Sequence, residues 1–276
     1  MRKWNLRENA LEKTMIVAHR GIAGGNIPCN NIPAYEAALC QGADMIELDV
    51  SRSTDGVLYA FHPGMEYAHL HSEKRIDAMH SSEVDRQRFF NQDGVITEQR
   101  VNRLDEVFEH LKNRCYINVD KYWEHIGPIT EAIRRHDMAD QILVKAWPDE
   151  GTLDLMEQVA PDMAFMILQK EKDEWTERVQ ARKLNFVGVE ALFATEESEF
   201  ASRGYVERMN EKGLIVWVNS IVYDYRSVLT AGHNDDISVT GRPDEGWGWL
   251  IERGYNLIQT DWPLALRLYM EKRGVQ

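Results

Sequence analysis

The sequence predicts an α/β fold, a single (β/α)8 or TIM-barrel domain that spans residues 1–276. Eight short apolar segments recur between Met15 and the end of the chain, and each is followed by a helical pattern. The apolar runs are continuous rather than alternating, which is typical of strands buried on both faces of a parallel sheet. Eight strand–helix units in about 260 residues are typical of a barrel, and a doubly wound open sheet is the alternative.

The elements of this barrel can be placed from the apolar runs and from the proline and glycine residues at helix ends. A short helix is expected over residues 3–13. The expected strands cover Met15–Ala18 and residues 44–50, 115–120, 141–146, 163–168, 185–190, 214–219 and 256–261. The expected helices cover residues 33–41, 104–112, 126–136, 149–158, 172–182, 197–211, 243–253 and 263–272. Pro33 and Pro263 stand at helix starts, where proline is tolerated, and Gly42 follows a helix end.

Residues 63–100 interrupt the alternation of strands and helices. They follow a short extended segment, Val57–His62, are mostly polar, and contain His69, His71 and His80. We predict an insertion or lid after the second strand, without a core of its own, because long connections in compact domains tend to be functional or mobile. The three histidines are expected at the surface.

The charge and cysteine content exclude several classes of protein. With 45 acidic and 32 basic residues the net charge is −13, which is unlike a nucleic-acid surface. A polybasic helix and a run of roughly 20 apolar residues are both missing, so no stable membrane association is expected. The N-terminal residues carry charges where a signal peptide would have its apolar region. The three cysteines lack a CxxC spacing, which suggests free thiols in a reducing compartment, so a cytoplasmic location is predicted.

Polar residues recur where the predicted strands end. Catalytic side chains of a barrel lie at the carboxyl ends of its strands, so these residues are expected to meet in one site. Glu190 and Asp261 could instead cap the following helices, Lys145 could be solvated, and Trp217 could either pack the barrel or wall the site. The strand-end residues are His19, Arg20, Glu47, Asp49, Asp120, Lys121, Lys145, Glu190, Asn219 and Asp261.

Three of these carboxylates favour a metal site. Glu47 and Asp49 are two residues apart in a strand and therefore project to the same face, and Asp120 ends the next strand. Two like charges about 5 Å apart repel by roughly 3 kcal/mol at an effective dielectric of 20. A divalent cation would remove this repulsion, and all-oxygen ligands favour Mg²⁺ or Ca²⁺ over Zn²⁺.

The chain also carries an ordered set of motifs. Together they resemble the glycerophosphodiester phosphodiesterase family of phospholipase-C-like barrels, over residues 15–263. The motifs are His19-Arg20-Gly21, Gly42-Ala43-Asp44, Glu47-Leu48-Asp49, Thr54-Asp55-Gly56, His62, Val216-Trp217-Val218-Asn219 and Thr260-Asp261-Trp262-Pro263. The chain departs from the family pattern at Asn30-Asn31-Ile32, where the family has Glu-Asn-Thr, at Pro63, where it has Asp, and at Asp120 and Tyr122, where it usually has Glu and Lys.

The resemblance implies metal-dependent hydrolysis of a small glycerophosphodiester to glycerol 3-phosphate and an alcohol. It implies that His19 and His62 act as general acid and base, and that Glu47, Asp49 and Asp120 hold the metal. The attacking group is either water or a hydroxyl of the substrate. Substrate or phosphate binding is expected from Arg20, Asn31, Lys121, Lys145 and Trp217.

Two alternative functions remain open. The aspartate at position 120 suits a sphingomyelinase-D-like or lysophospholipid phosphodiesterase. The proline after His62 and the altered third-strand motif suit a non-catalytic barrel that binds a phosphorylated metabolite. The presence of both histidines and both second-strand acids favours an enzyme, and the insertion is expected to determine which alcohol it accepts.

Overall fold

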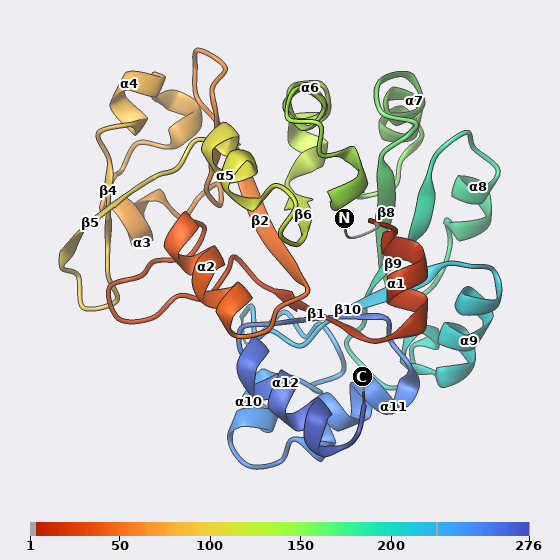
Figure 1. The fold of residues 1–276 in the computed structure, drawn as a ribbon. Coiled ribbons are helices and arrows are strands. Elements are labelled where there is room, and N and C mark those ends of the chain that lie inside the picture. The colour runs from red at the N-terminus through yellow and green to blue at the C-terminus, as the bar shows by residue number, and fades with distance from the viewer. Residues whose placement is uncertain (1–3, 225, 276) are drawn as a thin grey trace.

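The chain folds into a barrel of parallel strands (Figure 1). The computed structural model describes residues 4–224 and 226–275. Within these residues eight parallel strands follow each other around the barrel, and the pairing of the first strand with the second closes it. The (β/α)8 prediction is confirmed and the open sheet is wrong. In spatial order the strands are β1 (Met15–Ala18), β11 (Leu257–Thr260), β10 (Ile215–Asn219), β9 (Phe186–Leu192), β8 (Ala164–Lys170), β7 (Ile142–Ala146), β6 (Tyr116–Asp120) and β2 (Met45–Arg52).

Helices surround the barrel, close to the expected positions. The helix after β8 is shorter than predicted, and the connection from β10 to β11 contains α10 (Asp235–Val239), a π-helical turn (Asp244–Gly248) and α11 (Trp249–Arg253). No helix in the described part of the chain is long and apolar enough to cross a membrane. The other outer helices are α2 (Ile32–Cys40), α5 (Leu104–Leu111), α6 (Ile126–Arg135), α7 (Glu150–Val159), α8 (Thr176–Gln180), α9 (Arg203–Glu211) and α12 (Pro263–Lys272).

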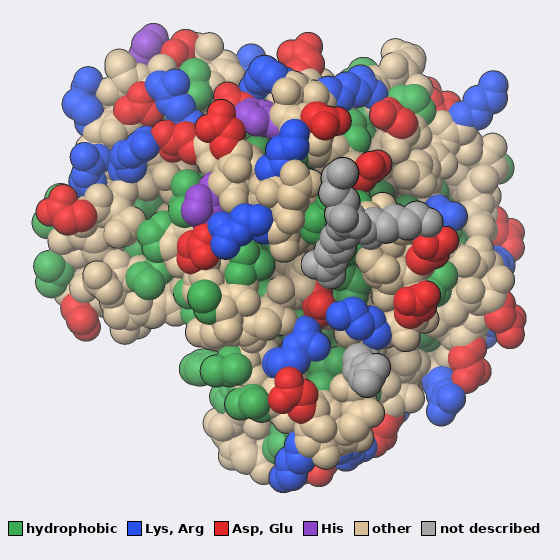
Figure 2. Space-filling model, in the orientation of Figure 1, with side chains coloured by type: hydrophobic (Ala, Val, Ile, Leu, Met, Phe, Trp, Pro, Cys, Tyr) green, Lys and Arg blue, Asp and Glu red, His purple; other side chains and the backbone are tan. Residues whose placement is uncertain are grey.

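The amino-terminal end of the barrel is covered by α1 (Leu6–Glu12). Leu6 and Ala10 of this helix pack on residues at the starts of the strands, among them Met15 and Met45. The space-filling view from this side shows acidic and basic side chains interspersed over the surface (Figure 2). The opposite end of the barrel, where the strands terminate, carries the polar residues described below.

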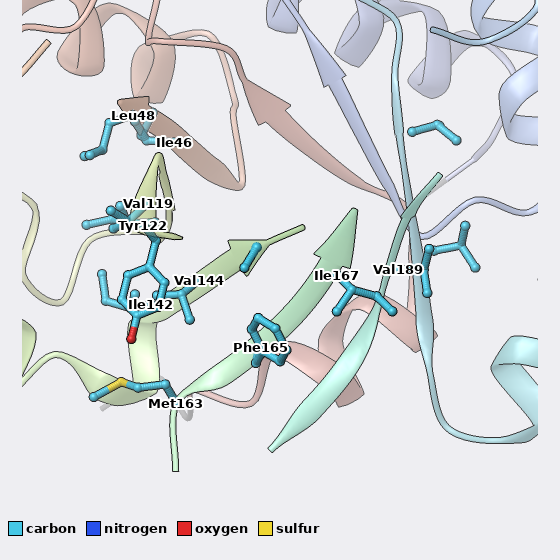
Figure 3. Packing of buried hydrophobic residues seen from close by; sticks show 14 of the residues in the cluster. Ile46, Leu48, Val119, Tyr122, Ile142, Val144, Met163, Phe165, Ile167 and Val189 are labelled. Atoms are coloured by element: carbon cyan, nitrogen blue, oxygen red, sulfur yellow. The ribbon is translucent and has the colours of Figure 1, made fainter. Parts of the chain in front are cut away.

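Successive side chains of a strand point alternately to the outside and the inside of the barrel, which places the main apolar core outside and the site residues inside. Ile46 and Leu48 of β2 pack outward in the layer between strands and helices, beside residues such as Val119 of β6 and Val144 of β7 (Figure 3). Side chains two residues apart in a strand share a face, so Glu47, between Ile46 and Leu48, projects to the inside of the barrel. The same apolar residues that hold β2 against the helices therefore aim its carboxylates at the barrel axis.

The insertion is more ordered than the sequence suggests. After β3 (Leu58–Ala60), which pairs antiparallel with β2, the chain forms several short elements beside the barrel (Figure 1). The segment was predicted to lack a core of its own, and in the structure its scattered apolar residues share a cluster with two aromatic residues contributed by the β3 region. The elements are α3 (Glu66–Leu70), a 3-10 turn (Ile76–Ala78), α4 (Ser81–Val84), β4 (Arg88–Phe90) and β5 (Ile96–Arg100). The cluster comprises Tyr59, Phe61, Leu70, Ile76, Met79, Val84, Phe89 and Val101.

Candidate active site at the carboxyl ends of the strands

Three carboxylates meet at the mouth of the barrel. Glu47 and Asp49 project from β2, and Asp120 ends β6, where the strand register places it beside Asp49. Each residue offers a carboxylate oxygen, and these oxygens lie within 4.8 Å of one another. Glu47 is only 2% exposed and Asp49 only 1%. The structure thus brings together the three residues predicted to bind a metal.

The electrostatics of this cluster fit a bound cation. Burial and the charge of Asp49 raise the pKa of Glu47 to about 7. Burial would also raise the pKa of Asp120, but Lys145 and Lys121 outweigh it and lower that pKa. The Oδ1 atom of Asp49 is buried and has no hydrogen-bond partner among the described residues. Three carboxylates that converge in this way form an all-oxygen donor set, which is what a hard divalent ion prefers, and the unsatisfied oxygen of Asp49 is free to bind such an ion.

His19 and Arg20 follow β1 and reach the cluster from the neighbouring strand. The Nδ1 atom of His19 lies 2.8 Å from Oδ1 of Asp261. Burial lowers the pKa of His19, but the hydrogen bond to Asp261 and the charge of Glu47 outweigh burial, and the net pKa is raised. Arg20 adopts a left-handed backbone with φ of 56°, and its N–H donates to Oε2 of Glu47 at 2.9 Å. Its Nε atom forms an ion pair with Asp49 at 2.9 Å.

His62 lies beside Oδ1 of Asp49, whereas Arg20 pairs with Oδ2. Its Nε2 atom is 3.9 Å from Oδ1 of Asp49, the oxygen that has no hydrogen-bond partner. Burial lowers the pKa of His62, although the charge of Asp49 opposes this shift. Both histidines, His19 and His62, line one cavity of about 200 Å³.

Two lysines place positive charge on the same cavity. Lys121 pairs with Asp120, with 3.1 Å between Nζ and Oδ2. Lys145 projects from β7, pairs with Glu190 at 2.5 Å, and lies over the ring of Trp217 with Nζ 4.2 Å from its centroid. Burial lowers the pKa of Lys145, but the charges of Glu190 and Asp120 outweigh burial and raise this pKa above its usual value, which favours the charged form.

Two predicted binding residues do not reach the cavity. The Oδ1 atom of Asn31 accepts a hydrogen bond from the N–H of Ala34 at 2.9 Å, so Asn31 caps α2. Trp217 is fully buried, and its Nε1 donates to Asn219 at 2.9 Å. Neither residue lines the cavity that holds the two histidines. In this structure both residues lie behind the side chains that line the cavity, and their predicted contact with the substrate stays a prediction.

Three residues of the site were missed or read differently from the sequence. Asn30 makes two hydrogen bonds to Asp49. Its Nδ2 donates to Oδ2 of Asp49 at 2.8 Å, and its Oδ1 accepts a hydrogen bond from the backbone N–H of Asp49 at 3.2 Å. Glu190 holds Lys145 and accepts from Asn219 at 2.7 Å, and Asp261 holds His19. The strand-end positions of Glu190 and Asp261 were the available signal, but an N-cap accounts equally well for a carboxylate there.

The comparisons with known proteins agree with this geometry. Residues 163–270 match a family model described as a domain of unknown function, DUF4996. A glycerophosphodiester phosphodiesterase of Bacillus altitudinis is 32% identical over 174 residues, which cover 56% of this chain and 66% of that relative, just under two thirds of its length.

Solved structures share the whole fold. The crystal structure of a glycerophosphoryl diester phosphodiesterase from Parabacteroides distasonis has a TM-score of 0.80 at 15% identity, covering 99% of this chain and 94% of the other. An Oleispira antarctica phosphodiesterase, solved with the product sn-glycerol-3-phosphate, has a TM-score of 0.70 at 18% identity, covering 94% and 98%. These likenesses establish the barrel architecture.

Proposed function

We propose that this chain is a glycerophosphodiester phosphodiesterase, which hydrolyses a glycerophosphodiester to glycerol 3-phosphate and an alcohol; its 32% identity to the Bacillus altitudinis enzyme supports the proposal. The observation that carries the proposal is that Glu47, Asp120, two histidines, an arginine and two lysines line one cavity, with Asp49 buried beside the two acids. Acids that can hold a cation, groups that can move protons and cations that can bind an anion are the parts that phosphodiester hydrolysis requires.

The metal site of this proposal consists of Glu47, Asp49 and Asp120, which would hold Mg²⁺ or Ca²⁺. The unsatisfied Oδ1 of Asp49 and the raised pKa of Glu47 support it, since a cation relieves both. When bound, the cation would withdraw negative charge from the phosphate oxygens. Asn30 would fix the ligand geometry, because it holds both the side chain and the backbone of Asp49.

Arg20 is placed to bind the phosphate. Its backbone N–H and its Nε are engaged by Glu47 and Asp49. Its two terminal nitrogens make no hydrogen bond to a described residue, and Arg20 lines the cavity. A guanidinium held on one side and open on the other offers a fork that matches two phosphate oxygens. Lys121 and Lys145 add positive charge beside it.

His19 and His62 would carry the protons. Asp261 engages Nδ1 of His19, so Nε2 is the nitrogen available to the substrate. One histidine takes the proton of the attacking hydroxyl, from water or from the substrate, as its oxygen bonds to phosphorus. The other gives a proton to the alkoxide oxygen as its bond to phosphorus breaks, so the alcohol leaves neutral.

A panel of soluble glycerophosphodiesters incubated with Mg²⁺, Ca²⁺, Mn²⁺ or EDTA tests the proposal. We expect release of glycerol 3-phosphate that requires a divalent cation and falls at least about 100-fold in His19→Ala, the usual scale for losing a general acid or base. Glu131→Gln, an exposed acid on α6, is the matched control and should retain full activity. Tight binding of diesters without turnover would instead favour a non-catalytic barrel.

A further inference from the structure

A groove leads away from the site between the first loop and the insertion. We call the cavity lined by His19 and His62 the catalytic cavity. A second cavity, of about 440 Å³, adjoins it, and both are lined by His19 and Arg20. A third cavity, of about 180 Å³, continues from it and shares Ala23, Cys29 and His69. We call the second and third cavities together the side groove.

We propose that the side groove binds the alcohol half of the diester, and that it is built for an uncharged polyol such as a second glycerol. This inference rests on the proposed function. His19 and Arg20 line both the catalytic cavity and the side groove, so phosphorus bound between them has one ester group on each side. The metal-binding acid Glu47 and both lysines line the catalytic cavity, which leaves the groove for the other ester group.

The charges along the groove argue against a cationic alcohol. The charged side chains on its walls stand at the junction with the catalytic cavity, where Asp261 is already engaged by His19. Asp261 is the acid among the described residues that line the groove, so a quaternary ammonium group would find no unpaired carboxylate there. Burial raises the pKa of the Cys29 thiol to about 11, although Arg20 opposes the shift, so this wall is neutral as well.

His69 gives the groove a group that recognises a hydroxyl. It lies in α3 of the insertion, and its ring packs edge-on against Phe61 and Phe89, with centroids 6.4 and 6.5 Å away. Its imidazole makes no hydrogen bond to a described residue. Burial, with the charges of Arg20 and His62, lowers its pKa, which favours the neutral ring with one donor and one acceptor. A fixed, half-buried imidazole without a partner is suited to bind the hydroxyls of a polyol.

Three diesters of sn-glycerol 3-phosphate test the proposal, with methanol, glycerol or choline as the leaving alcohol. We expect kcat/KM for the glycerol diester to exceed that for the choline diester by at least about 10-fold, the scale of one or two polar contacts. His69→Phe keeps the aromatic packing and removes both nitrogens. It should lower kcat/KM for the glycerol diester roughly 3- to 10-fold, the net effect of one hydrogen bond, and leave the methyl diester unchanged.

A second pair of variants fills the groove itself. Cys29→Phe should lower kcat/KM for the glycerol diester at least about 10-fold, because it occupies space that the alcohol needs, and should spare the methyl diester. Cys40→Phe, at an exposed cysteine on α2, is the matched control and should leave all three substrates unaffected.

The outcomes separate the groove from the proposed function. Equal effects of His69→Phe on methyl and glycerol diesters would overturn the role of His69 in binding the alcohol. Preference for the choline diester would overturn the uncharged class, and an unimpaired glycerol diester in Cys29→Phe would overturn the groove. Failure of the wild-type protein to hydrolyse even the methyl diester would refute the proposed function, and the groove proposal with it.

Discussion

The hydrogen bond between Asp261 and His19 makes a quantitative prediction. The two side chains are 2.8 Å apart, and Asp261 raises the pKa of His19 through both the hydrogen bond and its charge. A hydrogen bond to a charged group contributes roughly 1.5–3 kcal/mol. The Asp261 side chain is 47% exposed, so solvent screening reduces this to about 1–1.5 kcal/mol. At 1.36 kcal/mol per tenfold change, Asp261→Asn should lower kcat/KM roughly 5- to 12-fold.

The pH dependence of kcat/KM distinguishes this role from a structural one. Loss of the Asp261 charge lowers the pKa of His19, so the limb of the profile that reports this histidine should move to lower pH. The assay is glycerol 3-phosphate release from glycerophosphoglycerol from about pH 5 to 9, the range in which histidine titrates, at saturating cation. Glu131→Gln is the control. A rate within twofold of wild type and an unshifted limb in Asp261→Asn would refute the reasoning.

Further predictions concern the metal, the buried ion pair and a second buried acid. Saturating Mg²⁺ or Ca²⁺, at about 100 times its Kd, should stabilise the wild-type fold by about 2.7 kcal/mol in thermal unfolding, and Glu47→Gln should lose most of this gain; an equal gain in both would contradict the metal site. Lys145→Met should lower the free energy of unfolding by about 3–5 kcal/mol because it leaves Glu190 buried without its partner, and chemical denaturation would measure the loss. Burial raises the pKa of Asp235 to about 6, so its contribution to stability is full below its unfolded pKa and is lost as pH rises through about 6. The stability difference between wild type and Asp235→Asn should therefore change between about pH 4 and 7, and a constant difference would contradict this assignment.

The barrel and its central residues were predictable because they depend on local patterns. Continuous apolar runs indicated the strands, and residue alternation placed Glu47 and Asp49 on one face before any tertiary contact was known. The end of each strand then located Asp120 and Lys145 at the same mouth. These inferences needed only strand periodicity and the rule that parallel strands end at a common edge.

The parts that escaped prediction depend on contacts distant in sequence. Asn30 reaches Asp49 through a left-handed backbone with φ of 54°, which a residue pattern does not specify. His69 was expected at the surface, yet aromatic residues on both sides of it in the chain fix its ring. The insertion was expected to lack a core of its own because it is long and mostly polar; its few apolar residues meet only when several short elements fold together.

The central claim is that this barrel mouth hydrolyses a glycerophosphodiester with the help of a divalent cation. The most direct measurement is the rate of glycerol 3-phosphate release from glycerophosphoglycerol before EDTA, in excess EDTA, and after Mg²⁺ or Ca²⁺ is restored. We predict turnover that is lost on chelation and recovered with the cation in the wild-type protein, and that stays absent in Asp49→Asn. Undiminished turnover in EDTA, or turnover by Asp49→Asn at the wild-type rate, would contradict the account.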